Sequence, residues 1–206
     1  ALAAVEKIEA GWTKIQAMSE VALALAEVAD WDGLRQLLKT LEQIGYLYAP
    51  ANVIKNVAYA LAWSGEQDRL NQLLETLEKH WDERFKAIAW GGVASGLARS
   101  GDRERAWETV ESISEWFYQE KLEAFMGVAQ ALAEVGDREG ALETVGKMEY
   151  SGNKAYALSG VAGVLAKAGD QEGVKLALSA AVQIEHMGYK VQAMSGLAPS
   201  LALIGD

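Results

Sequence analysis

Cysteine is absent from this 206-residue sequence, and proline occurs only twice. A chain without cysteine forms neither a disulfide nor a thiolate metal site, and such a composition fits a cytoplasmic protein. No stretch approaches the roughly 18 consecutive apolar residues of a membrane span, and the first residues lack the basic and apolar regions of a signal peptide. We therefore expect a cytoplasmic protein with no membrane partner.

Residues that carry catalysis or bind cofactors are scarce. The two histidines, His80 and His186, have no partner in the spacing of a metal motif, and no glycine-rich phosphate loop or nucleophile elbow occurs. Basic residues number 19 against 29 acidic ones, which argues against nucleic acid because its binders need clustered Lys and Arg. The sequence therefore predicts a protein that is not an enzyme, with no cofactor, no metal and no nucleic-acid partner.

What the sequence does contain is one signal repeated along its length. One copy reads Val93-Ala94, Leu97-Ala98 and Gly101-Asp102, and successive copies lie 33 to 36 residues apart. The other copies begin at Val21, Val57, Val128, Val161 and Leu197. A period of this size is typical of stacked helical repeats. The abundance of Ala, Leu, Glu and Lys favours helix throughout.

The acidic excess comes mainly from the starts of the second helices. Each complete repeat carries an acidic residue just after the turn and another two residues later. These pairs are Asp30/Asp32, Glu66/Asp68, Asp102/Glu104, Asp137/Glu139 and Asp170/Glu172. The first residue is placed to cap the helix through its free N–H groups, and the second lies where the helix dipole favours negative charge. We interpret the pairs as helix caps that leave an acidic ridge along one edge.

These features predict an all-α fold, a right-handed α-solenoid of stacked antiparallel helix pairs that forms a single domain over residues 1–206. Five full repeats are expected at 14–49, 50–85, 86–120, 121–153 and 154–189, with a partial second helix at 1–13 and a partial repeat at 190–206. Helices are expected at 14–28, 31–44, 51–64, 67–80, 84–100, 103–117, 120–135, 138–148, 153–168, 171–187 and 190–204. Because the array begins and ends within a repeat, we expect a segment of a longer chain.

The fifth unit shows the residue pattern most clearly. It consists of Leu158, Val161-Ala162, Leu165, Gly169-Asp170, Val174, Leu178 and Ala181. This pattern resembles that of tetratricopeptide repeats, and the resemblance covers essentially the whole chain. The sequence departs from the family in lacking the usual proline at the end of each unit, and only Trp90 supplies the usual first-helix tryptophan. The resemblance implies first helices that line a concave binding face, while another helical-hairpin solenoid is the alternative.

First-helix residues that the core does not need are the candidates for binding. The second unit is the most distinctive, because its first helix combines an ammonium, two amides, a phenol and an indole. Aromatic and arginine side chains commonly dominate binding hot spots. The expected partner-binding residues are Asn52, Lys55, Asn56, Tyr59, Trp63, Ser95, Arg99 and Gln130. Packing of Tyr59 and Trp63 between neighbouring first helices is the alternative interpretation.

Glycine recurs at equivalent places in the later first helices. These residues are Gly92, Gly127, Gly160 and Gly196. Glycine within a helix costs about 1 kcal/mol relative to alanine, so its repeated use needs a reason. Close approach of neighbouring backbones is the expected reason, and room for a ligand backbone is the alternative. Trp81 and Trp116, near the ends of second helices, are expected at the surface.

The sequence thus predicts a non-catalytic scaffold module that binds a protein or peptide along the concave face. Two alternatives remain open. One is a structural spacer or self-association segment whose ends stack on other copies, and the other is the ligand-sensing arm of a larger signalling protein that carries an NTPase or protease module.

Overall fold

The computed structural model describes residues 12–28, 30, 32–34, 36–37, 51–80 and 82–205. Their regular secondary structure is entirely helical, so the all-α prediction is confirmed for this part of the chain. The helices are α2 (Trp12–Glu27), α4 (Ala51–Ser64), α5 (Gln67–His80), α6 (Glu83–Arg99), α7 (Arg103–Glu111), the 3₁₀ helix η2 (Glu115–Phe117), α8 (Tyr118–Glu134), α9 (Arg138–Lys147), α10 (Ser151–Lys167), α11 (Gln171–Val182) and α12 (Met187–Ile204).

Two predicted helices end earlier than expected. The helix predicted at 103–117 stops at Glu111, and the one predicted at 171–187 stops at Val182. In the first case the backbone leaves the helix at Ser112, whose hydroxyl donates to the carbonyl oxygen of Thr109, and a short 3₁₀ turn follows. Serine favours such local bonds over continued helix. The helices predicted at 1–13 and 31–44 lie for the most part outside the described residues.

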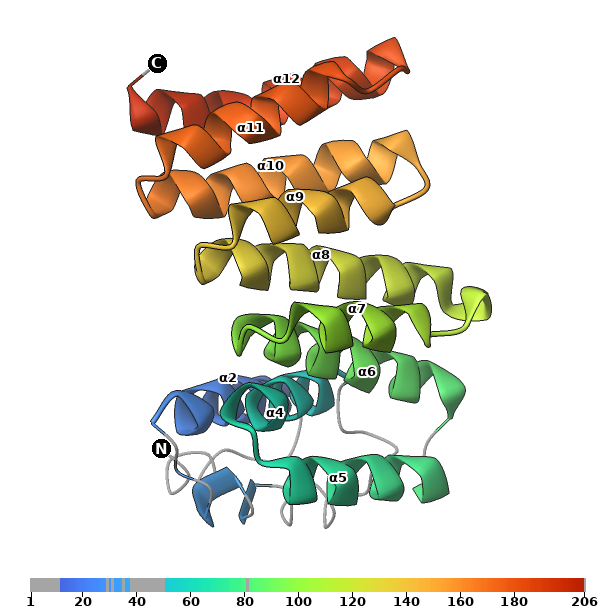
Figure 1. Cartoon of the computed structure of the whole chain (residues 1–206). Coiled ribbons are helices and arrows are strands. Elements are labelled where there is room, and N and C mark those ends of the chain that lie inside the picture. Colours follow the sequence, from blue (N-terminus) through green and yellow to red (C-terminus); the bar gives the residue numbers. More distant parts are fainter. Residues whose placement is uncertain are drawn as a thin grey trace.

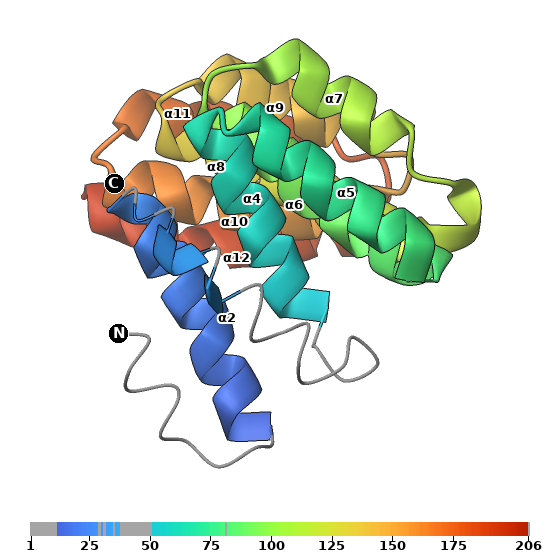
Figure 2. The same ribbon diagram turned by 90° about the horizontal axis from the view of Figure 1, so that it is seen from below.

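The first helices of the repeats, α2, α4, α6, α8, α10 and α12, pack on one another in chain order (Figure 1). The helices α7, α9 and α11 each pack against the first helix that precedes them, and they lie together on one side of the stack (Figure 2). Contacts between first helices are much more extensive than those between second helices. The stack therefore depends mainly on the surfaces of its first helices.

The repeated signal forms the hydrophobic core. Its leucines and its first alanines are buried in the first five copies; these residues are Leu25, Leu61, Leu97, Leu132 and Leu165, and Ala22, Ala58, Ala94, Ala129 and Ala162. In the last copy the equivalent Leu201 is half-buried and Ala198 is exposed. Burial of a leucine side chain stabilises a fold by about 1.5–3 kcal/mol, so the repeated signal accounts for much of the stability.

The turn between the helices of a pair is built the same way in successive units. Gly101 has a φ of +91°, a left-handed conformation that favours glycine, and the N–H of Asp102 donates to the carbonyl oxygen of Leu97 at 2.9 Å. The carboxylate of Asp102 accepts the N–H of Arg105 at 3.2 Å. The same cap bond recurs at Asp30, Asp137 and Asp170. The interpretation as caps is confirmed for these four aspartates, whereas the Glu66 carboxylate forms an ion pair with Arg69.

The recurring first-helix glycines lie where neighbouring first helices approach each other. A Cβ added to Gly92 would lie 2.2 Å from the carbonyl oxygen of Lys55, and one added to Gly127 would lie 2.4 Å from the hydroxyl oxygen of Ser95. Gly160 and Gly196 meet side chains of the preceding first helix in the same way. Close packing of helices, rather than room for a ligand, explains these glycines.

Candidate partner-binding surfaces

The structure brings three of the expected binding residues into one row across the first helices. The rings of Tyr59 and Trp63 on α4 lie 6.0 Å apart at an interplanar angle of 47°. The guanidinium carbon of Arg99, at the end of α6, lies 4.6 Å from the centroid of the Trp63 ring. Arg99 also forms an ion pair with Glu134, at the end of α8. We call Tyr59, Trp63, Arg99 and Glu134 the first-helix row.

The row is held in place from both sides. A guanidinium over an indole face is attracted by the electrons of the ring, and the carboxylate of Glu134 fixes the guanidinium from the other direction. Beneath the row, the main chain of α4 packs closely against Gly96 of α6. A Cβ added to Gly96 would lie only 2.3 Å from the Tyr59 carbonyl oxygen. Trp63 and Arg99 are half-buried, so each retains an exposed surface. The row spans three successive first helices.

The other expected residues are divided between accessible and packed positions. Lys55 and Asn56 are half-buried on α4, one turn or more before the row. Asn52 lies in the first turn of α4, and its side chain is outside the described part of the structure. Ser95 is only 6% exposed, and its hydroxyl donates to the carbonyl oxygen of Gly91 at 2.9 Å. Its inclusion in a partner-binding face is therefore not supported, because the hydroxyl is directed into the α6–α8 contact.

Gln130 on α8 is half-buried and has a packing role as well. A Cβ added to Gly160 would lie 2.8 Å from the amide nitrogen of Gln130, so this side chain covers the glycine of the next first helix. Ser95 and Gln130 thus both take part in the packing between neighbouring first helices.

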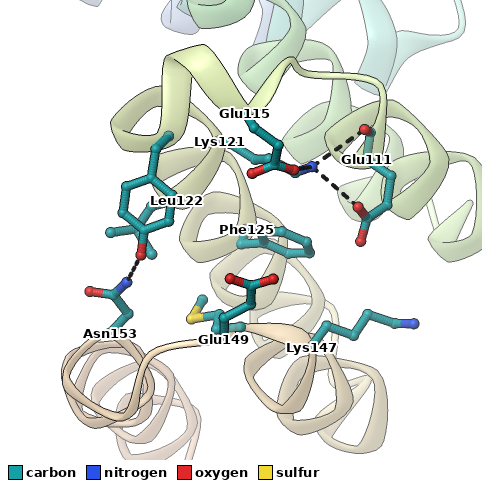
Figure 3. A pocket seen from close by; sticks show the side chains of 10 residues that line it. Glu111, Glu115, Lys121, Leu122, Phe125, Lys147, Glu149 and Asn153 are labelled. Carbon is teal, nitrogen blue, oxygen red and sulfur yellow. Dashed lines mark hydrogen bonds and ion pairs between the residues drawn. The ribbon is translucent and has the colours of Figure 1, made fainter.

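A second surface, which we did not expect from the sequence, lies at the edge where second helices lead into the next first helices. It contains a cavity of about 80 Å³ between the ends of α7 and α9 and the start of α8 (Figure 3). Its lining includes Glu111, Glu115, Lys121, Phe125, Lys147 and Glu149. Figure 3 shows the Glu149 carboxylate beneath the Phe125 ring and Lys147 extending away from it.

Lys121 is the buried cation of this cavity. The residue is 8% exposed, and its ammonium lies 2.6 Å from Glu115 Oε1 and 3.3 Å from Glu111 Oε2. Burial opposes the charged form, but the hydrogen bonds to Glu115 and Glu111 outweigh it and raise the pKa of Lys121. The ammonium is therefore charged and is neutralised by the carboxylates of Glu111, at the end of α7, and Glu115, in η2.

An open groove of about 520 Å³ adjoins the cavity and is rich in aromatic side chains. It is lined by Tyr118, Glu149, Tyr150, Asn153, His186 and Tyr189. The rings of Tyr118 and Tyr150 meet edge to face with centroids 5.5 Å apart, and those of His186 and Tyr189 lie 4.6 Å apart. The amide of Asn153 donates to the Tyr118 hydroxyl. Burial is the main cause that raises the pKa of Tyr118. We call this surface the loop-edge groove.

The sequence carries a signal for this edge that we missed. Three connecting segments, those that lead into α8, α10 and α12, contain a buried apolar residue followed by a glutamate and then an exposed aromatic residue. The glutamate–aromatic pairs are Glu115-Trp116, Glu149-Tyr150 and Glu185-His186. The expectation that Trp116 lies at the surface is confirmed, since it is 93% exposed. Trp81 lies outside the described residues.

Neither surface offers a metal site. Within the described ranges, no three His, Cys, Asp or Glu side chains come together in a way that could hold a metal ion. Over the same part of the chain, the helices are too short or too polar to cross a membrane.

Searches of protein-family models and of curated proteins find no match to this sequence. The functional interpretation therefore depends on the chemistry of the two surfaces alone.

Proposed function

We propose that this chain is a right-handed α-solenoid of the tetratricopeptide-like type, and that it is a non-catalytic module that binds a protein or peptide across its first helices. The observation that carries the proposal is the first-helix row, in which Tyr59, Trp63, Arg99 and Glu134 connect three successive helices. The in-order packing of the first helices and the capped glycine turns support the solenoid.

The row has the chemistry of a binding hot spot. Trp, Tyr and Arg are the residues whose truncation most often weakens protein interfaces. Arg99 is positioned by a ring and a carboxylate before any partner binds, so little of its rotamer freedom remains to be lost on binding. A partner that lies along the row would contact an aromatic surface and a fixed pair of opposite charges. Such a surface suits an extended segment with alternating apolar and polar side chains.

The proposal is tested by selecting ligands from a random peptide library displayed on phage, with the whole chain as bait. Enriched peptides are then measured by titration calorimetry against the chain with Trp63→Ala and against a control with Tyr156→Ala. Tyr156 lies on α10, is 62% exposed and is remote from the row in the sequence. We expect at least a tenfold loss of affinity for Trp63→Ala, about 1.4 kcal/mol, and no change for the control. Peptides that bind both variants equally would refute the site.

A second candidate function is self-association through α12. Val191, Met194, Ala198 and Ala202 are exposed and recur at intervals of three or four residues, so they form one stripe. The equivalent stripe of α10, Ala155, Leu158, Ala162 and Ala166, is buried within the stack. A second copy that packs against α12 would extend the interface that the first helices already form with one another.

Sedimentation velocity over a wide concentration range tests this second candidate. We expect association of the native chain and its loss in Met194→Glu, because a carboxylate in a helix contact would be desolvated. Leu176→Glu on α11 is the matched control, since Leu176 is 38% exposed and lies away from the stripe. A native chain that remains monomeric at high concentration would exclude self-association.

A further inference from the structure

We propose that the loop-edge groove binds an organic cation, namely the guanidinium or ammonium group of a basic side chain in a peptide. The groove combines exposed tyrosine rings with one carboxylate, Glu149, which lines both the groove and the adjoining cavity. Tyrosine rings attract cations through their faces, and a nearby carboxylate adds direct charge attraction. This site is separate from the first-helix row and does not depend on the function proposed for that row.

The aromatic rings are partly pre-arranged. Tyr118 is fixed by its edge-to-face contact with Tyr150 and by the hydrogen bond from Asn153. Tyr189 lies close to Gly152, where an added Cβ would be 3.0 Å from a ring carbon, and its ring also contacts that of His186. Tyr150 and Tyr189 nevertheless remain 58% and 41% exposed. Rings that are held in place but not covered are suited to ligand binding rather than to the core.

The charges around the groove favour a cation. Glu149 forms no hydrogen bond and no ion pair within the described part of the chain. The two lysines that line the cavity are already engaged: the ammonium of Lys121 lies between Glu111 and Glu115, and that of Lys147 lies 4.3 Å from the centroid of the Trp107 ring. Among the described residues, the Glu149 carboxylate is therefore left without a counter-ion at the border of the groove.

The carboxylates at the opposite edge of the stack are in a different situation. Asp137 and Asp170 cap helices, and they also face Arg103 and Arg138 of the preceding unit at 3.7 Å and 3.2 Å. The charges of these two aspartates are therefore already compensated by main-chain N–H groups and arginine side chains. Glu149 serves no comparable structural purpose, and it lies among aromatic rings. This contrast separates a binding carboxylate from the many acidic residues that only start helices.

The test uses a short arginine peptide, acetyl-Gly-Arg-Gly-amide, and its citrulline counterpart, which keeps the shape of the side chain but lacks the charge. Binding to the whole chain is followed by NMR at low ionic strength. We expect the arginine peptide to bind in the millimolar range and the citrulline peptide to bind about tenfold more weakly or not at all. Glu149→Gln and Tyr150→Leu should each weaken arginine binding about three- to tenfold.

Two matched variants control for general effects of charge and of aromatic surface. Glu172→Gln removes an exposed carboxylate at the opposite edge, and Tyr156→Leu removes an exposed tyrosine of α10 that does not line the groove. Both should bind the arginine peptide as the native chain does. Equal binding of the citrulline peptide, equal binding by Glu149→Gln, or no binding of the arginine peptide at 10 mM would each overturn the proposal.

Discussion

The replacement of Gly96 by alanine tests whether the stack depends on close contact between first helices. In an isolated helix this change would be stabilising by about 1 kcal/mol, because alanine has the higher helix propensity. In the structure the added Cβ would lie 2.3 Å from the carbonyl oxygen of Tyr59, 2.8 Å from the Cβ of Ala62 and 2.9 Å from the main-chain nitrogen of Trp63. Two of these three atoms belong to the backbone of α4 and cannot rotate away.

The size of the effect follows from these distances. Non-bonded carbon and oxygen atoms are in contact at about 3.5 Å, so α4 and α6 would have to separate by about 1 Å. Overpacking of this kind costs about 3 kcal/mol where no side chain can move, and the gain in helix propensity offsets about 1 kcal/mol of it. We therefore expect Gly96→Ala to lower the free energy of unfolding by about 2 kcal/mol.

Urea denaturation followed by circular dichroism measures this change, and the same chain offers a matched control. Gly163 lies within α10, and a Cβ added there meets nothing within 4 Å. Gly163→Ala should therefore raise the free energy of unfolding by about 0.5–1 kcal/mol. The reasoning is refuted if both substitutions are stabilising, because the helix contact would then tolerate a side chain at Gly96.

Two further predictions concern single interactions. Asp137→Ala removes the carboxylate that accepts the Gly140 N–H at 2.8 Å, so it should lower the free energy of unfolding, measured by urea denaturation, by about 1 kcal/mol. The control Glu139→Ala, at an exposed first-turn position, should change the free energy of unfolding by less than half as much. Lys121 has a pKa above its ordinary value of 10.5, so its charge stabilises the fold fully below pH 10.5 and ceases to do so as pH rises through the folded-state pKa. The difference in unfolding free energy between the native chain and Lys121→Met should therefore be constant from about pH 7 to pH 9 and should shrink above pH 10.5; a difference that grows there would contradict this reasoning.

The parts of the fold that repeat could be predicted from the sequence. The helices at 51–64 and 67–80 have the expected bounds, and the left-handed glycines and aspartate caps lie where the pattern indicated. Each of these features is fixed by residues within a few positions of one another. The early end of α7 could not be predicted so easily, because Ile113 continues the apolar row of Ala106 and Val110, and only the local bonds of Ser112 and Ser114 end the helix.

The candidate surfaces were less predictable because they are formed by residues that are far apart in the sequence. Helical periodicity placed Ser95 on the same face of α6 as Arg99. It could not show that α8 approaches so closely at Gly127 that the Ser95 hydroxyl is covered by that helix. The loop-edge groove was missed because its residues come from three connecting segments that are about 35 residues apart in the sequence. The glutamate–aromatic pairs occur in these segments, outside the helices that carry the repeated signal.

The way in which the first helices pack determines where a partner can bind. Their middle portions carry Ala, Gly and Ser, which allow neighbouring helices to come close but leave little side chain exposed. The large side chains of the two candidate surfaces lie towards the helix ends: Trp63 and Arg99 lie at C-terminal ends, and Tyr118 and Tyr189 lie at N-terminal ends. These two ends face opposite edges of the stack. A ligand of the row and a ligand of the groove should therefore bind together without competition, and a competition assay with both ligands would show whether the edges act independently.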